Sequence, residues 1–163
     1  MARRVGFSSL MNGVELPKGD LHFEVLGALD ESSAAIAMAR STSKDVETNG
    51  VLKTIQEDLS NLMGLVAGVA PSNTIFSDRL VWIERTITEV KKRVSIPKGF
   101  IVPGENTCEA SLDLARTVAR RAERTLTRFV DSGSAVDLAA LQYLNRVSTL
   151  LYFFELNARN SVG

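Results

Sequence analysis

A row of arginines is the part of this sequence whose side chains could most clearly do chemistry. Arg116, Arg120 and Arg124 follow one another at four-residue spacing, which lines them up along one side of a helix, and Arg121 stands one step round. Positive charges stacked in this way repel one another, so such a helix face needs carboxylates or a bound anion beside it. Arginine suits forked recognition of phosphate or carboxylate. Spacing alone supports equally an anion site and a set of ion pairs to another helix or subunit.

Two polar pairs interrupt apolar helical patterns elsewhere. Asp30 and Glu31 follow Leu29 in a segment of helical periodicity, and a carboxylate beside a core needs a partner. An arginine of segment 115–124 is the natural candidate for that partner. Asn145 precedes an arginine in the last apolar pattern, and its amide can both donate and accept, either to fix a ligand or to join a neighbouring helix.

The composition excludes several other classes of site. A di-iron bundle needs two Glu-x-x-His motifs, but the chain has one histidine, His22, which we expect at the surface. That histidine, with no nucleophile elbow, gives no support for a serine hydrolase either. One cysteine, Cys108, cannot form an intrachain disulfide or a thiolate cage, so we expect a small buried side chain and no protein-built metal site.

Charge and hydropathy limit the partners. Nineteen basic residues balance nineteen acidic ones, so no overall field favours nucleic acid or an anionic membrane. No apolar run reaches the roughly 18 residues of a membrane span, and no apolar segment of a secretory signal follows the two N-terminal arginines. We expect one cytoplasmic domain over residues 1–163.

Helical periodicity predicts the elements that position these residues. Apolar side chains recur at helical spacing over five segments: 20–40, 51–69, 78–94, 106–131 and 136–160. Asp20 and Ser77 are candidate N-caps, and Asn106 with Glu109 forms a candidate capping box. Pro71 should end the second helix.

The connections between the helices predict the fold class. They are short and carry no convincing strand, which favours an all-α, up-and-down antiparallel bundle of the four-helix-bundle type. Residues 96–104 contain two prolines and two glycines and should form a loop with an apolar centre. Residues 1–19 predict an N-terminal loop. Its Gly6-Phe7-Ser8-Ser9 stretch lacks the spacing and the lysine of a Walker A loop.

Three sequence blocks together resemble one enzyme family. They are FIVPG at 100–104, ARTVARRAER at 115–124 and YLNRVS at 143–148. Their order and separation are similar to those of the PduO-type ATP:corrinoid adenosyltransferases. Residues 27–31 and 56–59 resemble that family's first- and second-helix patterns, so the resemblance covers essentially the whole chain.

The resemblance implies both an assembly and a reaction. The assembly is a homotrimer of bundles with active sites between subunits. The reaction moves the 5′-deoxyadenosyl group of ATP to the cobalt of a reduced corrinoid such as cobalamin and releases triphosphate. Cobalt(I) would be the nucleophile, so the protein would supply positioning and electrostatics. Mg²⁺ would accompany the triphosphate.

The same resemblance implies roles for the site residues. Arg120 would contact the polyphosphate of ATP, with Arg124 beside it. Glu123 and Asn145 would orient the nucleotide.

The remaining implied roles concern the subunit interface and the corrinoid. Arg116 would pair with Asp30 of a neighbouring subunit. Phe100 would lie over the corrin, where exclusion of the lower axial ligand makes the cobalt easier to reduce.

The N-terminal loop departs from the family's pattern. The usual phosphate cradle, Thr-Gly-Asp-x-Gly-x-Thr-x-Leu, aligns with residues 2–10, where the opening reads Ala-Arg-Arg. Gly6, Ser8, Ser9 and Lys18 remain as candidate nucleotide contacts, and Arg3 or Arg4 could supply others. Two alternatives to a working transferase follow. One is a paralogue that binds corrinoid or nucleotide as a carrier or sensor, and the other is a purely structural helical oligomer.

Overall fold

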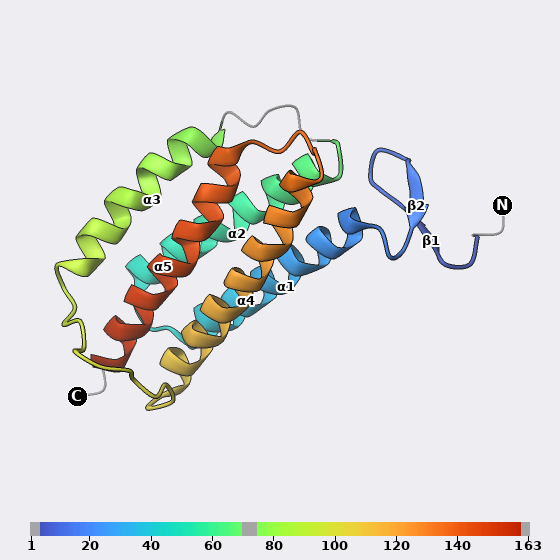
Figure 1. Ribbon diagram of the computed structural model, residues 1–163. Coiled ribbons are helices and arrows are strands. Elements are labelled where there is room, and N and C mark those ends of the chain that lie inside the picture. Colours follow the sequence, from blue (N-terminus) through green and yellow to red (C-terminus); the bar gives the residue numbers. More distant parts are fainter. Residues whose placement is uncertain (1–3, 70–74, 161–163) are drawn as a thin grey trace.

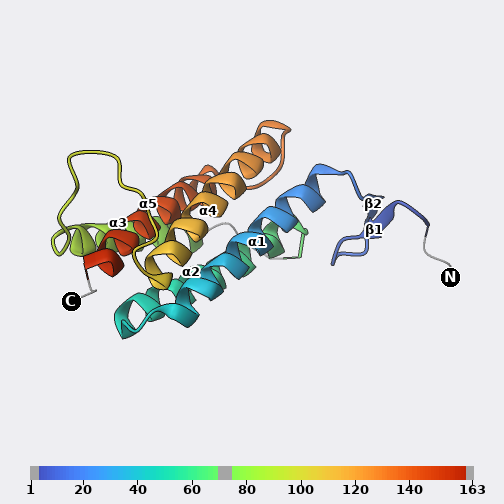
Figure 2. The same cartoon turned by 90° about the horizontal axis from the view of Figure 1, so that it is seen from below.

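Five long helices and one short β-hairpin make up the computed structural model, which describes residues 4–69 and 75–160 (Figure 1). The helices lie side by side in alternating directions (Figures 1 and 2). The predicted all-α bundle is therefore confirmed. In chain order the elements are β1 (Phe7–Ser9), β2 (Glu15–Pro17), α1 (Leu21–Thr42), α2 (Val46–Val66), α3 (Ile75–Lys91), α4 (Thr107–Asp131) and α5 (Leu138–Asn160).

Helix α4 holds the middle of the bundle. It packs extensively against α1 on one side and α5 on the other, while α2 packs on α1 and α3 on α5. The buried stripe of α4 includes Ala115, Ala119 and Ala122, all fully buried. Small side chains at i, i+4 and i+7 let neighbouring helices approach closely. The arginines of α4 therefore border a well-packed core.

Several helix boundaries differ from prediction. Helix α2 begins at Val46 rather than near 51, because Asp45 caps it by accepting from Glu47 N at 3.1 Å. Helix α3 begins at Ile75, before Ser77, and ends at Lys91 instead of 94. Helix α5 begins at Leu138 instead of 136. The predicted end of the second helix at Pro71 lies outside the described residues.

The start of α4 is capped by two side chains. Asn106 Oδ1 accepts from Glu109 N at 2.9 Å, as the capping box predicts. The Glu109 carboxylate accepts from Glu105 N at 2.7 Å and Gly104 N at 3.3 Å, one and two residues before the expected Asn106 N. The cap thus also secures the end of the loop that precedes α4.

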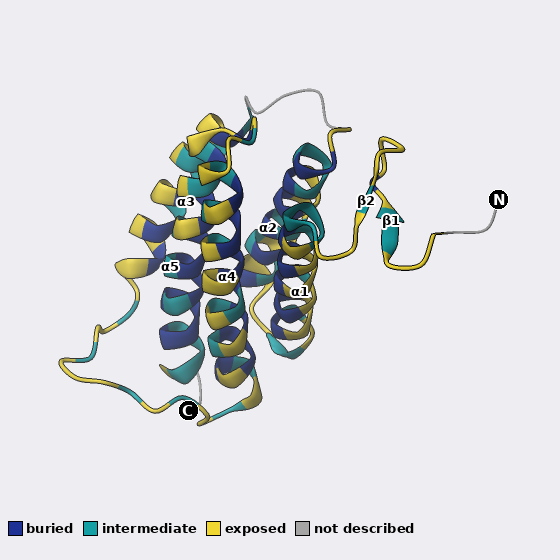
Figure 3. Cartoon of the chain, turned by 45° about the vertical axis from the view of Figure 1, so that its right-hand side comes forward, coloured by how far each residue is buried: buried dark blue, intermediate teal, exposed yellow. Residues whose placement is uncertain are grey.

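The N-terminal segment contains a hairpin that the sequence analysis missed. β1 and β2 pair antiparallel, with Phe7 opposite Pro17. Gly13 takes a φ of 88° in the turn, a conformation that favours glycine. The hairpin extends away from the helices, and its surface is largely exposed (Figures 1 and 3). Neither strand packs on a helix of its own chain, and contact is made at the turn, where Asn12 lies against Gly68.

Candidate functional site

The arginines of α4 differ in what they contact. Arg121 pairs with Glu31 of α1, and Arg128 pairs with Glu24 at 3.0 Å. Arg124 donates to the backbone oxygen of Arg120 at 3.3 Å and, within the described chain, pairs with no carboxylate. The exposed Arg120 side chain makes no ion pair in that part of the chain either.

An open groove runs between α1 and α4. Arg121, Arg124 and Arg128 line it together with Glu24 and Glu31, so positive charge exceeds negative charge. Gly27, Ala28 and Thr125 also line the groove, and their small side chains leave space between the two helices. The groove could hold an anion with several negative charges.

The structure brings Glu123 and Asn145 together, as the resemblance implied. Asn145 Nδ2 of α5 donates to Glu123 Oε1 of α4 at 2.7 Å. Both residues line a hollow of about 380 Å³ between α3, α4 and α5, beside Arg146, whose Nε lies 2.6 Å from Glu84 Oε1. Arg120 lies three residues before Glu123, so the two positions are neighbours on the surface of α4.

Arg116 is held inside its own chain by two acids. Its Nε lies 3.1 Å from Asp113 Oδ1 and 3.3 Å from Glu155 Oε2 of α5. Asp30 is exposed and has no ion-pair partner in residues 4–69 or 75–160. The arginine of α4 that reaches the Asp30-Glu31 pair is Arg121, and it takes Glu31. The Arg116–Asp30 pair therefore does not form within one chain, and its formation between subunits stays a prediction.

Phe100 lies fully in the open, with 97% of its surface exposed. Its loop is nonetheless anchored, because Arg159 of α5 donates to Val102 O at 3.0 Å and pairs with Glu109 at 2.8 Å and Glu105 at 3.2 Å. An exposed phenylalanine on an anchored loop is typical of a binding surface.

The candidate nucleotide residues near the N-terminus all lie on or beside the hairpin. Lys18 N donates to Gly6 O at 2.8 Å, and Gly6 has a φ of 81°. Ser8 and Ser9 belong to β1. Because neither strand packs on a helix of its own chain, these residues and Arg120 do not form one cluster within the chain.

The structure describes one of the two N-terminal arginines, Arg4. Arg4 stacks over the Phe7 ring at 3.9 Å, a cation–π contact that orders the start of the hairpin. Arg3 lies outside the described residues.

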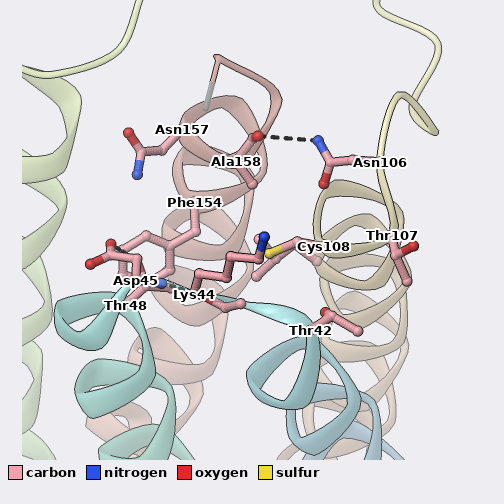
Figure 4. A pocket seen from close by; sticks show the side chains of 12 residues that line it. Thr42, Lys44, Asp45, Thr48, Asn106, Thr107, Cys108, Phe154, Asn157 and Ala158 are labelled. Carbon is pink, nitrogen blue, oxygen red and sulfur yellow. Dashed lines mark hydrogen bonds between the residues drawn. The ribbon is translucent and has the colours of Figure 1, made fainter. Parts of the chain in front are cut away.

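A partly open pocket of about 360 Å³ lies at the end of the bundle where α4 begins (Figure 4). Leu112 and Phe154 form its apolar part, and Cys108 borders it, half-buried rather than buried as expected. Polar groups in its walls already have hydrogen-bond partners within the chain: Asn106 accepts from Glu109 N and donates to Ala158 O. We assign this pocket no ligand.

His22 is more constrained than the surface position we expected. Its Nδ1 lies 2.7 Å from Asp20 Oδ1, and its ring meets Phe129 edge-on at 4.7 Å between centroids. This contact fastens the start of α1 to the end of α4.

A buried polar cluster also escaped prediction. Asp58 of α2 is fully buried, accepting from Arg79 Nε at 2.8 Å and from the Tyr143 hydroxyl at 2.6 Å. Burial raises the pKa of Asp58, while these two hydrogen bonds oppose the rise. The cluster joins α2, α3 and α5. Asp58 and Tyr143 both stand in sequence blocks singled out above, which is the one signal that could have located them.

Known proteins resemble this chain in sequence and in fold. A family model described as cobalamin adenosyltransferase matches residues 5–158. A corrinoid adenosyltransferase of Bacillus subtilis is 30% identical over 168 residues, covering 97% of this chain and 85% of the relative. Corrinoid adenosyltransferase PduO of Citrobacter freundii is 31% identical over 152 residues, covering 90% of this chain and 45% of the relative. The chain thus spans about half the length of that relative.

A solved structure agrees with the fold. A PduO-type ATP:corrinoid adenosyltransferase variant from Lactobacillus reuteri, complexed with cobalamin and ATP, matches with a TM-score of 0.81 at 23% identity, covering 95% of this chain and 89% of that one. The extent of the family match and the agreement in fold lead to one conclusion: the chain belongs to the cobalamin adenosyltransferase family.

Proposed function

We propose that this protein is an enzyme that transfers the 5′-deoxyadenosyl group of ATP to the cobalt of a reduced corrinoid. The observation that carries the proposal is the arrangement on α4, where Arg120, which makes no ion pair within the described chain, lies one turn from the bonded Glu123–Asn145 pair. Family membership over residues 5–158 supports the same reaction.

The reaction asks the protein for placement and charge rather than for a general base. The electron pair of cobalt(I) forms the bond to C5′ of ATP, and the pair of the C5′–O bond leaves with triphosphate. Negative charge therefore builds up on the triphosphate oxygens. Arg120 and Arg124 would stabilise that charge, and they need no reorganisation to do so if they are already in place.

Mg²⁺ belongs with the nucleotide in this proposal. Among the described residues, no group of three or more His, Cys, Asp or Glu side chains could hold a metal ion. Protein-bound Mg²⁺ with ATP usually keeps phosphate and water ligands with only one or two carboxylates. We therefore treat Mg²⁺ as part of the ATP substrate.

The active site would lie between subunits of a homotrimer. Two observations support this: the hairpin extends away from its own bundle, and Asp30 has no partner within the described chain. The hairpin of one subunit, with Gly6, Ser8, Ser9 and Lys18, would cover α4 of the next. Arg116 of that α4 would reach Asp30 of its neighbour.

The corrinoid would bind against the exposed Phe100, whose ring would keep the lower axial ligand from the cobalt.

No helix in residues 4–69 or 75–160 combines the length and apolar character needed to cross a bilayer. We propose a cytoplasmic enzyme in which residues 1–163 form one domain.

The test is an assay of adenosyl-corrinoid formation from ATP and chemically reduced cobalamin. Arg120→Ala should lower kcat/KM by on the order of 10²-fold, because a charge-stabilising donor is lost at the leaving group. Calorimetry should show weaker ATP binding with an intact oligomer. The matched control is Arg85→Ala, an exposed arginine of α3.

Three other results would overturn parts of the proposal. ATP binding without product would indicate a carrier or sensor. No ATP binding by the wild type would indicate a structural oligomer. Unchanged ATP binding by the Arg120→Ala variant would remove the phosphate role of that arginine.

A further inference from the structure

Glu155 of α5 is a buried carboxylate, and one of its two oxygens has no hydrogen-bond donor within the described chain. The residue is 1% exposed, and its buried Oε2 accepts no hydrogen bond from the described chain. Burial, together with repulsion from Asp113, raises the pKa of Glu155, and Arg116 only partly opposes that effect. An uncharged side chain of similar size would avoid the cost of burying this charge and would leave Arg116 paired with Asp113. Stability therefore gives no reason for an acid at this position.

The neighbour of this carboxylate is the guanidinium of Arg116. Oε2 of Glu155 lies 3.3 Å from Arg116 Nε, on the edge that Asp113 also occupies at 3.1 Å. Arg116 Nη2 donates to Asp113 as well. Among the described residues no hydrogen bond joins Nη1 to an acid, and the Arg116 side chain keeps 28% of its surface exposed, so one corner of the guanidinium is open to a further partner.

Asp113 alone would fix Arg116 poorly. It stands one turn away on the same helix and is itself partly exposed, so the two side chains could move together. Glu155 comes from a different helix and is immobilised by burial. A second point of attachment on another element restricts the torsions of the arginine and sets where its open corner faces.

The other charged groups nearby cannot take over this role. Glu109 of α4 also acts on Glu155 but is bound by Arg159 at 2.8 Å. Arg159, one turn beyond Glu155 on α5, is engaged by Glu105 and Glu109. Arg116 is thus the cation that Asp113 and Glu155 share.

We propose that Glu155 is a positioning residue, which holds the Nε edge of Arg116 so that its open Nη1 corner reaches Asp30 of a neighbouring subunit. This inference rests on the intersubunit part of the proposed function. The buried charge lowers the stability of the single bundle and, in return, orients a contact that the single bundle does not use.

The first experiment is a double-mutant cycle on subunit association, measured by analytical ultracentrifugation without ATP or corrinoid. Glu155→Gln should raise the dissociation concentration of the oligomer by about tenfold in the wild-type background. In the Asp30→Asn background the same substitution should change it by less than about twofold, because the partner that it serves is gone. Glu89→Gln, which neutralises an exposed acid of α3, is the matched control.

The second readout follows Arg116 directly. The Nε–Hε resonance of Arg116 should shift as pH falls through the raised pKa of Glu155, since protonation removes the charge that holds Nε. In Glu155→Gln this titration should disappear, while the unfolding temperature should stay equal or rise. Glu155→Met, of similar size without polar atoms, repeats both measurements if the glutamine variant does not fold.

The outcomes separate the two proposals. Equal weakening in both backgrounds, or an Arg116 resonance indifferent to Glu155, would overturn the positioning role. A wild-type protein that assembles but forms no adenosyl-corrinoid would overturn the proposed reaction and leave this result standing. A monomeric wild type would overturn the intersubunit contact and, with it, the purpose assigned to Glu155.

Discussion

At the scale of single residues, the arginines of α4 have two kinds of surroundings. Arg121 and Arg128 are neutralised by glutamates of α1, whereas Arg120 makes no ion pair in the described chain. Spacing alone supported ion pairs and an anion site equally; the structure shows ion pairs for Arg121 and Arg128, and the anion site stays a prediction. The sequence could not assign them, because neighbouring positions on a helix differ by about 100° in direction. The same rotation explains why Glu31, and not Asp30, meets an arginine of its own chain.

The Asp58 cluster yields a prediction about stability. Tyr143→Phe removes the hydroxyl that donates to Asp58 Oδ2 at 2.6 Å and leaves that buried oxygen without a donor. The free energy of unfolding should fall by about 1–3 kcal/mol. Urea denaturation near neutral pH measures the change. Tyr152→Phe, at a half-buried position of the same helix, should change stability much less, and equal losses in the two variants would contradict the prediction.

At the scale of elements, strong periodicity and caps were predictable but weak strands were not. The three-residue strands of the hairpin contain two serines and a proline, so they carry neither alternation nor β-branched residues. The first turn of α2 was missed for a related reason. Thr48, Asn49 and Gly50 have low helix propensity, and the Asp45 cap and the packing of α2 on α1 outweigh that preference.

The α4 cap leads to a prediction for the loop that carries Phe100. Asn106→Ala removes the acceptor for Glu109 N and the donor to Ala158 O. The free energy of unfolding should therefore fall by about 1 kcal/mol. Amide exchange over residues 100–106 should also speed up. Chemical denaturation and hydrogen-exchange mass spectrometry give the two readouts. Asn61→Ala, on an exposed face of α2, should leave both almost unchanged; a stable, slowly exchanging Asn106→Ala variant would show that the cap is dispensable.

At the scale of the whole molecule, the helix order and the antiparallel bundle followed from the 3.6-residue period and the polar breaks between periodic segments. The candidate site followed only in part. Glu123 and Asn145 meet within one chain, but the hairpin residues do not meet Arg120, and Asp30 does not meet Arg116. Contacts that would form only between copies leave no trace in the hydrophobic pattern of a single chain.

The outward hairpin has a genetic consequence. If each active site takes its hairpin from one subunit and its α4 from the next, two alleles that are each impaired in a different one of these elements should complement each other. In mixed trimers of Lys18→Ala and Arg120→Ala chains, about a quarter of the interfaces would receive an intact hairpin and an intact helix. Co-expression of the two should therefore restore adenosyl-corrinoid formation to roughly that fraction. A mixture of Arg120→Ala and Glu123→Ala chains, both changed on α4, should restore no adenosyl-corrinoid formation. Equal activity of the two mixtures would mean that each chain completes its own site.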